Sequence, residues 1–340
     1  MTRTRGFLLG KFMPPHEGHL LLCDVASDLV DELTVLVCSR GCEPISGDLR
    51  LNWMKESLGN KARVLHLHRE IPQEPHDHPD FWNIWRRTIR ELHPEPIDMV
   101  FGSEDYILRL AAELEAEPFI VDKERNLVPI SATQIRDNPQ LYWEHIPRTV
   151  RPFFQKRICI LGPESTGKSE LSQKLANHFN TFYMPEYGRD YDAIYRKGKD
   201  WQASDFTAIA RGHQALRRNL GQHSGYFFLE DTDLLQTIVW AEYLLGRIPA
   251  DLDKLLENWE FAAFYLLLKP DVAWLDDGTR YSGDNEVRKW FFDKLRTILS
   301  DLKLPFEVIS GKDWNPRELA AIEAVNKIGK PGRKIVHSRM

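Results

Sequence analysis

Short apolar runs alternate with amphipathic stretches along the first half of the sequence. The runs are rich in β-branched and aromatic residues, whereas the stretches between them repeat apolar residues at helical spacing. Regular alternation of this kind predicts a parallel, doubly wound sheet covered by helices. The predicted strands are 6–9, 33–38, 64–68, 97–101 and 119–121, and the predicted helices are 18–30, 47–58, 80–92 and 106–115.

A second β-α series begins near Lys156. Its predicted strands are 157–161, 226–229, 264–268 and 306–309, with helices between them. The stretch 139–155 contains prolines and no strand pattern, so we place the domain boundary near residue 150. The predicted fold class is therefore α/β, with two doubly wound parallel-sheet domains at 1–150 and 151–330. The basic segment 331–340 is predicted to be a flexible tail.

Composition narrows the kinds of partner that the chain can bind. The chain has 340 residues, of which 42% are hydrophobic and 28% charged, as in a globular protein of two domains. A formal charge of -5 argues against a broad nucleic-acid surface and favours small-molecule substrates. The four cysteines show neither a disulfide framework nor zinc spacing. Because no apolar run approaches the ~20 residues of a membrane span, we expect no membrane insertion and a cytoplasmic location.

A phosphate-binding pattern opens the second domain. Residues 162–169 satisfy G-x-x-x-x-G-K-[ST] between a predicted strand and a predicted helix, a context that disfavours an accidental glycine-rich turn. Backbone N–H groups of this loop would point at nucleotide phosphates. Lys168 would reach the β- and γ-phosphates, and Ser169 would be a ligand of Mg²⁺. The predicted ATP-binding residues here are Gly162, Pro163, Glu164, Ser165, Thr166, Gly167, Lys168 and Ser169.

Carboxylates follow one predicted strand and one short strand-like segment of the same domain. Asp231 ends an apolar strand, where the metal-side acid of a phosphoryl-transfer site is expected, although it could instead be the N-cap of the next helix. Glu186 or Asp233 then remains to meet the acceptor hydroxyl. Tyr187 and Arg189, beside Glu186, are further candidates for acceptor binding.

The polar, glycine-containing segment 274–280 follows another predicted strand, as a lid would. Asp276 and Asp277 are candidates for acceptor binding. Arg280 is a candidate catalytic cation that stabilises the transferring phosphoryl group. The alternative for Arg280 is an ordinary solvated loop arginine.

The first predicted strand of the chain runs into a segment with two histidines around a glycine. His16 and His19 can both bind triphosphate oxygens over a helix N-terminus, and Gly18 permits close backbone approach. A zinc site is the alternative, but H-x-x-H is a weak zinc signal and no third ligand is evident. The spacing is similar to that of the HxGH nucleotidyltransferases. The ATP-binding candidates at this end are Gly10, Lys11, Phe12 and Gly18.

A second segment, 130–136, resembles the ISxTxxR signature of the same family. Ser131 would cap a helix, Thr133 would add a hydroxyl, and Arg136 would add a cation near the ATP phosphates. Adenylyl transfer then needs no covalent intermediate. An acceptor phosphate attacks the α-phosphorus of ATP while the histidines, Lys11, Arg136 and Mg²⁺ disperse charge and position the groups.

An HxGH adenylyltransferase followed by a P-loop kinase resembles the bacterial NadR-type proteins, which combine nicotinamide-nucleotide adenylyltransferase and ribosylnicotinamide kinase activities. The resemblance extends from Gly6 to about Ile328 and includes PEYGRD at Pro185, DTD at Asp231 and WLDDGTR at Trp274. It implies an adenylyltransferase at 1–150 and a kinase at 151–330. It also implies ATP, ribosylnicotinamide, nicotinamide mononucleotide and NAD as partners, with Mg²⁺ accompanying ATP.

The family's flat, cationic nicotinamide ring would suit an aromatic face. Trp82 and Trp85 are candidates, although their shared helix face is equally typical of a core stripe. Because the first strand begins by Gly6, the helix-turn-helix of some family members and transcriptional control by this chain alone are not expected. A homo-oligomer is compatible with the sequence.

Two other functions fit the same motifs. One is a pantetheine-phosphate or flavin-type adenylyltransferase fused to another nucleoside kinase, which the chemistry of the acceptor would discriminate. The other is a nucleotide-sensing regulator without rapid turnover, against which the intact His16, His19, Lys168 and Asp231 argue.

Overall fold

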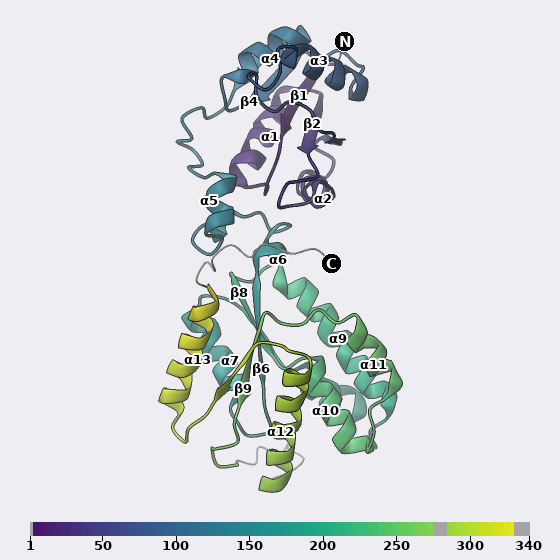
Figure 1. Cartoon of the computed structure of the whole chain (residues 1–340). Helices are drawn as coiled ribbons and strands as arrows, with labels where there is room; N and C mark the ends of the chain where they lie inside the picture. Colours follow the sequence, from purple (N-terminus) through teal and green to yellow (C-terminus); the bar gives the residue numbers. More distant parts are fainter. Residues whose placement is uncertain (1–2, 275–283, 330–340) are drawn as a thin grey trace. The chain divides into compact units, whose positions relative to one another are not determined.

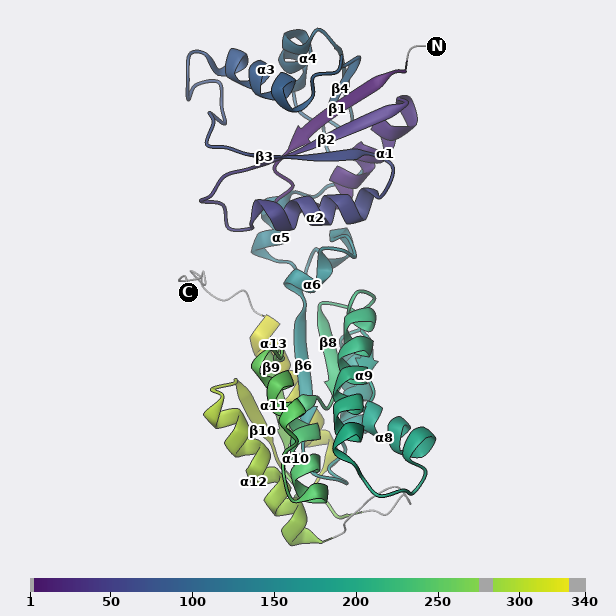
Figure 2. The same cartoon turned by 90° about the vertical axis from the view of Figure 1, so that its right-hand side faces the viewer.

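A computed structural model of the chain describes residues 3–274 and 284–329. The chain divides into two compact units, Met1–Phe153 and Phe154–Met340. Each unit has a five-stranded sheet whose neighbouring strands are all parallel (Figure 1, Figure 2). The prediction of two doubly wound parallel sheets is confirmed.

The first unit alternates strands and helices as the apolar pattern predicts. Its strands are β1 (Arg5–Gly10), β2 (Glu32–Ser39), β3 (Arg63–His68), β4 (Met99–Gly102) and β5 (Glu117–Ile120). Its helices are α1 (Glu17–Leu29), α2 (Gly47–Leu58), α3 (Phe81–Leu92), α4 (Tyr106–Leu114) and α5 (Ala132–Asp137), followed by the 3-10 turn η1 (Trp143–His145) and α6 (Arg151–Phe154).

The strand order β3-β2-β1-β4-β5 places β1 at the centre of the sheet. Strand β5 contains Pro118 and lies at an edge, where the missing N–H costs no ladder bond. Side chains of β1 alternate between two cores, since Phe7 packs with α3 and α4 and Leu8 packs with α1 and α2. Helices therefore cover both faces (Figure 2), and the ends of β1 and β4 meet where the strand order reverses.

The second unit repeats this architecture. Its strands are β6 (Lys156–Leu161), β7 (Tyr183–Met184), β8 (Phe227–Asp231), β9 (Phe264–Leu268) and β10 (Phe306–Ile309). Its helices are α7 (Lys168–His178), α8 (Tyr187–Tyr191), the π-helical turn η2 (Asp192–Arg196), α9 (Ala203–Gly221), α10 (Leu234–Leu245), α11 (Ala250–Glu257), α12 (Asn285–Asp301) and α13 (Trp314–Gly329).

The order β10-β9-β6-β8-β7 places β6 at the centre of the second sheet. Helices α7 and α13 pack together on one face, and α9 to α12 lie on the other (Figure 1). Strand β8 is buried along its whole length, as expected for an apolar run in the middle of a parallel sheet. Both β6 and β8 thus deliver the residues that follow them to the carboxyl edge of the sheet.

Membrane insertion was not expected from the sequence. Over residues 3–274 and 284–329, no helix combines the length and the apolar character needed to cross a bilayer.

Candidate functional site

The two histidines of the first unit lie where β1 gives way to α1. His16 is the N-cap of α1, and its ring stacks on that of His19 with centroids 3.7 Å apart. Burial lowers the pKa of His16 to about 4 and lowers the pKa of His19 well below its ordinary value, so both rings are neutral at pH 7. A side chain at Gly18 would lie 3.2 Å from the His16 ring, a tight contact that the ring would have to relieve by shifting.

The tautomer of His19 follows from its hydrogen bond. The backbone N–H of His16 donates to Nδ1 of His19 at 3.3 Å. Nδ1 is therefore the acceptor, and the proton of the neutral ring is on Nε2. His19 can thus donate a hydrogen bond to a phosphate oxygen from Nε2.

The structure brings the second nucleotidyltransferase segment to the first. Ser131 caps α5, accepting a hydrogen bond from the backbone of Gln134, as the sequence predicted. Arg136 of α5 donates to the carbonyl oxygen of Met13, in the loop after β1, and to Oγ1 of Thr133 at 2.9 Å. The guanidinium of Arg136 therefore lies beside the loop that leads to the histidines.

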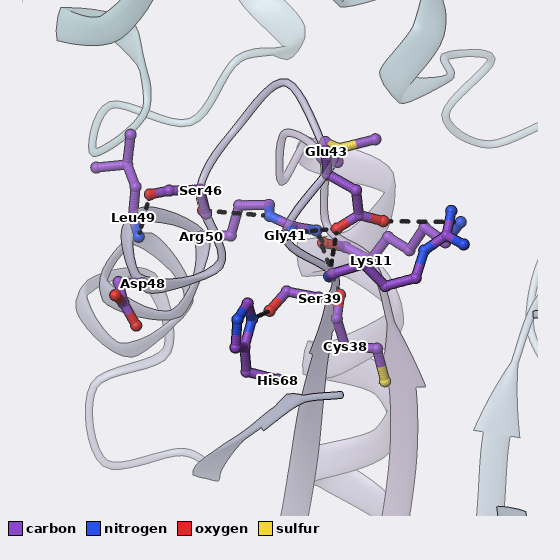
Figure 3. A network of polar contacts seen from close by, with 12 residues as sticks. Lys11, Cys38, Ser39, Gly41, Glu43, Ser46, Asp48, Leu49, Arg50 and His68 are labelled. Carbon is purple, nitrogen blue, oxygen red and sulfur yellow. Dashed lines mark hydrogen bonds and ion pairs between the residues drawn. The ribbon is translucent and has the colours of Figure 1, made fainter. Parts of the chain in front are cut away.

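A buried arginine that the sequence analysis missed anchors the same loop (Figure 3). Arg50 of α2 is fully buried and donates to the carbonyl oxygens of Lys11 at 2.6 Å and Cys38 at 3.3 Å. It also pairs with the Glu43 carboxylate at 2.5 Å, and the Lys11 ammonium lies 3.8 Å from that carboxylate. Arg50 thus ties the end of β1 to the end of β2 and positions Lys11. Its place on the helix face that buries Trp53 was the available signal.

Replacing Arg50 with methionine is expected to lower the free energy of unfolding by about 3 kcal/mol, because the Glu43 carboxylate would lose its buried partner and keep only the more distant Lys11 ammonium. Urea unfolding of the wild type and the variant measures the change. The matched control is Arg69→Met, which breaks an exposed ion pair with Glu91 at 2.7 Å and should leave the midpoint nearly unchanged. A wild-type midpoint for R50M would show that the pair has no structural role.

The two candidate tryptophans of the first unit have different surroundings. Trp85 is buried in the core next to α4, and its Nε1 donates to the carbonyl oxygen of Pro72 at 2.9 Å. Trp82 is half-buried against the same core, with the Arg109 guanidinium 5.9 Å from its ring centroid. Packing in the core explains the position of Trp85. Stacking of one of these tryptophans on the nicotinamide ring stays a prediction.

The phosphate-binding loop of the second unit joins β6 to α7. Gly167 has φ +81, and a side chain there would lie 2.3 Å from the Trp314 ring, so glycine is required for two reasons. The Lys168 ammonium donates to the carbonyl oxygen of Pro163 at 3.1 Å, inside the loop. Arg288, which is buried, donates to the carbonyl oxygen of Glu164 at 3.2 Å. The loop is therefore held in shape by bonds to its own carbonyl groups.

Ser169 and Asp231 meet at the carboxyl edge of the sheet. The Ser169 hydroxyl donates to Oδ2 of Asp231 at 2.5 Å, while Oδ1 is buried without a hydrogen-bond partner in the described part of the chain. Burial, and then the nearby Glu186 carboxylate, raise the pKa of Asp231 above its usual range. Two oxygen ligands suit Mg²⁺, which is commonly held by one or two protein groups together with nucleotide phosphates. No group of three or more His, Cys, Asp or Glu metal ligands is found among residues 3–274 and 284–329.

A cavity of about 300 Å³ opens beside the loop. Charged, apolar and aromatic side chains all contribute to its lining. The charged lining residues are Glu164, Lys168, Glu186, Arg189, Asp192 and Lys197, and the apolar ones are Ala193, Trp201, Phe206, Ile209, Trp240 and Leu244. Gly188, Gly198, His213, Thr232, Gln236 and Thr237 complete the lining.

Only some of the residues near Glu186 that were predicted to bind the acceptor line this cavity. Glu186 and Arg189 both line it, joined by an ion pair of 3.1 Å. Tyr187 is not among the lining residues, and its ring packs against Gly212 of α9. The candidates Asp276, Asp277 and Arg280 lie outside the described residues.

Asp233, which the sequence analysis proposes as an acceptor residue, has other partners in the structure. Its Oδ1 accepts from the backbone N–H of Leu235 and its Oδ2 accepts from the Tyr265 hydroxyl, each at 2.9 Å. Both oxygens are thus engaged, and Asp233 does not line the cavity. The helix-capping role that the sequence left open for Asp231 belongs to Asp233.

Sequence reasoning also missed His213, Trp201 and Trp240 as cavity residues. His213 shares a face of α9 with Phe206 and Ile209, at offsets of seven and four residues. This spacing is a signal of burial only, because nothing in the sequence distinguishes a cavity wall from a core.

Comparisons with known proteins agree with this geometry. Residues 7–138 match the family described as Cytidylyltransferase-like, and residues 157–317 match the AAA domain family. A nicotinamide-nucleotide adenylyltransferase of Methanococcus vannielii is 26% identical over 156 residues, covering 43% of this chain and 85% of that protein. A solved structure of NadR protein in complex with NR shares the fold, with a TM-score of 0.77, 24% identity and coverage of 100% of this chain and 98% of that chain.

The chain is similar along most of its length to the trifunctional NAD biosynthesis/regulator protein NadR of Escherichia coli (strain K12). The two are 32% identical over 346 residues, which cover 96% of this chain and 83% of that protein. The resemblance predicted from the motifs is confirmed. The chain belongs to the NadR family, and it is an enzyme of NAD biosynthesis that combines a nicotinamide-nucleotide adenylyltransferase domain with a P-loop kinase domain.

Proposed function

We propose that the second domain transfers the γ-phosphoryl group of ATP to the 5′-hydroxyl of ribosylnicotinamide. The first domain then transfers the adenylyl group of another ATP to the resulting nicotinamide mononucleotide, giving NAD and pyrophosphate. The observation that carries the proposal is one cavity whose lining includes Lys168, Glu186, Trp201 and Trp240. A cationic aromatic ring suits a cavity with aromatic lining residues. The solved relative that holds NR, which we take as ribosylnicotinamide, supports the same acceptor.

In the kinase domain, residues at the sheet edge bind and orient the phosphates. Lys168 lines the cavity and would contact the β- and γ-phosphates in place of the Pro163 carbonyl oxygen. Ser169 and Asp231 would hold Mg²⁺, which when bound neutralises charge on the nucleotide phosphates. Asp231 lies beside the loop and is almost completely buried, so it is shielded from bulk water.

The acceptor side of the cavity needs a carboxylate for the 5′-hydroxyl. Glu186 lines the cavity, and the guanidinium of Arg189 holds its Oε2 at 3.1 Å. The carboxylate would orient the hydroxyl and accept its proton as the new P–O bond forms and the bond to ADP breaks. With Asp233 committed to helix capping, Glu186 is the acceptor-side carboxylate that we propose.

In the adenylyltransferase domain, the acceptor is the phosphate of the mononucleotide. One of its oxygens attacks the α-phosphorus of ATP, and the bond from that phosphorus to pyrophosphate breaks. His19 would donate from Nε2 to the ATP phosphates, and Lys11 and Arg136 would add positive charge. The protein supplies positioning and charge stabilisation without a covalent intermediate.

Exchanging the two carboxylates for amides should separate their roles. Asp231→Asn is expected to raise the Mg²⁺ concentration required for half-maximal kinase activity, because it removes a charged ligand. Glu186→Gln is expected to leave that titration unchanged and to raise the KM for ribosylnicotinamide or lower kcat at saturating metal. Kinase rates measured against Mg²⁺ and against acceptor concentration give both quantities.

Adenylyl transfer from supplied mononucleotide is the internal control for these two variants, since neither residue lies in the first domain. If Glu186→Gln changes the Mg²⁺ titration and Asp231→Asn does not, the two assignments are reversed.

The proposed acceptor is tested by incubating the purified chain with Mg-ATP and ribosylnicotinamide and measuring mononucleotide and NAD separately. We expect mononucleotide to form first and NAD to follow. Absence of mononucleotide, while supplied mononucleotide is still converted to NAD, would refute ribosylnicotinamide as the kinase acceptor.

A further inference from the structure

One buried side chain of the kinase cavity has an unused hydrogen-bonding atom. His213 of α9 is 3% exposed and lines the cavity. Its Nε2 lies 2.7 Å from the carbonyl oxygen of Thr232, the residue after Asp231. Its Nδ1 is also buried and has no hydrogen-bond partner in the part of the chain that the structure describes.

The protonation state of this ring follows from its surroundings. A carbonyl oxygen can only accept, so Nε2 of His213 carries a proton and donates it to Thr232. Burial lowers the pKa of His213 to about 4, and the nearby Arg217 and Arg157 also disfavour the cation. The ring is therefore neutral at pH 7, and Nδ1 is a bare acceptor.

An unsatisfied acceptor inside a protein is unfavourable and rare. The acceptor of His213 belongs to a residue in the wall of a cavity, and two other residues of its helix, Phe206 and Ile209, line that cavity as well. The Thr232 bond holds the ring in one orientation. Nδ1 itself is covered in this structure, so a ligand that enters the cavity can satisfy it once a neighbouring side chain shifts.

We infer that Nδ1 of His213 accepts a hydrogen bond from an uncharged O–H or N–H group of the nucleoside that the kinase domain phosphorylates. His213 is then a specificity-determining residue for the acceptor. The inference rests on the proposed kinase function of the cavity. Two groups of ribosylnicotinamide have the required chemistry, namely the ribose hydroxyls and the carboxamide N–H.

Two substitutions separate the two nitrogens of the ring. The amide nitrogen of glutamine is as many bonds from Cα as Nε2 of histidine, so His213→Gln retains a donor for Thr232 and loses the acceptor. The amide oxygen of asparagine is as many bonds from Cα as Nδ1, so His213→Asn retains the acceptor and loses the donor. If His213 has only a structural role, the His213→Gln variant should be closer to wild type than His213→Asn. If Nδ1 accepts a hydrogen bond from the nucleoside, the His213→Asn variant should bind ribosylnicotinamide better than His213→Gln.

For His213→Gln we expect the KM for ribosylnicotinamide to rise about tenfold, the scale of one lost hydrogen bond, with little change in kcat or in the KM for ATP. His213→Asn should remain within a few-fold of wild type. Adenylyl transfer from supplied mononucleotide and the unfolding midpoint are the controls for folding. If neither variant folds, wild-type chain with isotope-labelled imidazole nitrogens gives the same test, because ribosylnicotinamide, but not ATP alone, should shift the Nδ1 resonance.

Analogues identify the partner group. The carboxylate analogue of ribosylnicotinamide lacks the amide N–H, and the 2′-deoxy and 3′-deoxy analogues each lack one hydroxyl. The analogue that lacks the true partner should bind equally well to wild type and His213→Gln, whereas the others should retain the tenfold difference. Equal KM values of wild type and His213→Gln for ribosylnicotinamide itself would overturn the inference. If wild type does not phosphorylate ribosylnicotinamide at all, the proposed function is wrong and the inference falls with it.

Discussion

Replacing Lys168 with alanine is expected to abolish the formation of mononucleotide from ribosylnicotinamide and to spare the formation of NAD from supplied mononucleotide. Lys168 is almost completely buried at the start of α7 and lines the kinase cavity. Its ammonium is the cation of the phosphate-binding loop that can meet the transferring phosphoryl group. Losing one such group from a water-shielded site lowers the rate by about 10² or more.

Separate assays of the two products measure this effect. Lys174→Ala is the matched control, because Lys174 lies on the same helix and pairs with Glu170 and Glu318 at the surface. It should leave both activities unchanged. Parallel loss of both activities in a folded Lys168→Ala variant would contradict the assignment of one reaction to each domain.

Replacing His19 with alanine is expected to lower adenylyl transfer by about 10² or more, while phosphorylation of ribosylnicotinamide continues. The bond from the His16 backbone to Nδ1 orients the ring and leaves the Nε2 proton for a phosphate oxygen. Alanine removes both the donor and the ring that stacks on His16. Initial rates of NAD formation from supplied mononucleotide give the size of the loss.

The matched control for His19 is His76→Ala. His76 is in the same unit, but its side chain is 82% exposed, so its removal should not affect either rate. Normal NAD synthesis by His19→Ala would assign His19 to structure instead of to the reaction.

Local patterns were sufficient to predict the strands of the first sheet, those of the second sheet except the two-residue β7, and the two nucleotide motifs. Strand β8 illustrates why: Phe227, Phe228 and Leu229 form an apolar run that only a buried strand accommodates well in this context. The phosphate-binding loop is equally local, since its glycines and Lys168 must follow one strand and begin one helix. Such features depend on neighbours in sequence, which the sequence shows directly.

The roles of individual acids depend on which way each side chain points. Asp231 and Asp233 are two residues apart, yet Asp231 meets Ser169 whereas Asp233 meets Tyr265 of β9. A composition or spacing rule cannot distinguish them, because the partners come from distant strands and helices. The role of Arg50 was equally hard to predict. It donates to the backbone carbonyl oxygens of Lys11 and Cys38, and no sequence pattern identifies such acceptors.

The cavity lining is the least predictable part of the site. His213 and Trp240 come from two different helices, and each has the burial of an ordinary core residue or nearly so. Whether such a side chain faces a cavity depends on how the helices pack. The comparison of His213→Gln with His213→Asn therefore tests a role of His213 that could be inferred only from the structure.

The central claim is that one chain uses ATP in two chemically different ways. ATP labelled with radioactive phosphorus, in one experiment at the γ position and in another at the α position, tests it directly with ribosylnicotinamide as the only acceptor. We predict that the γ label appears in the mononucleotide and then in NAD, whereas the α label appears in NAD and never in the mononucleotide. A mononucleotide without γ label, or NAD without α label, would contradict the claim.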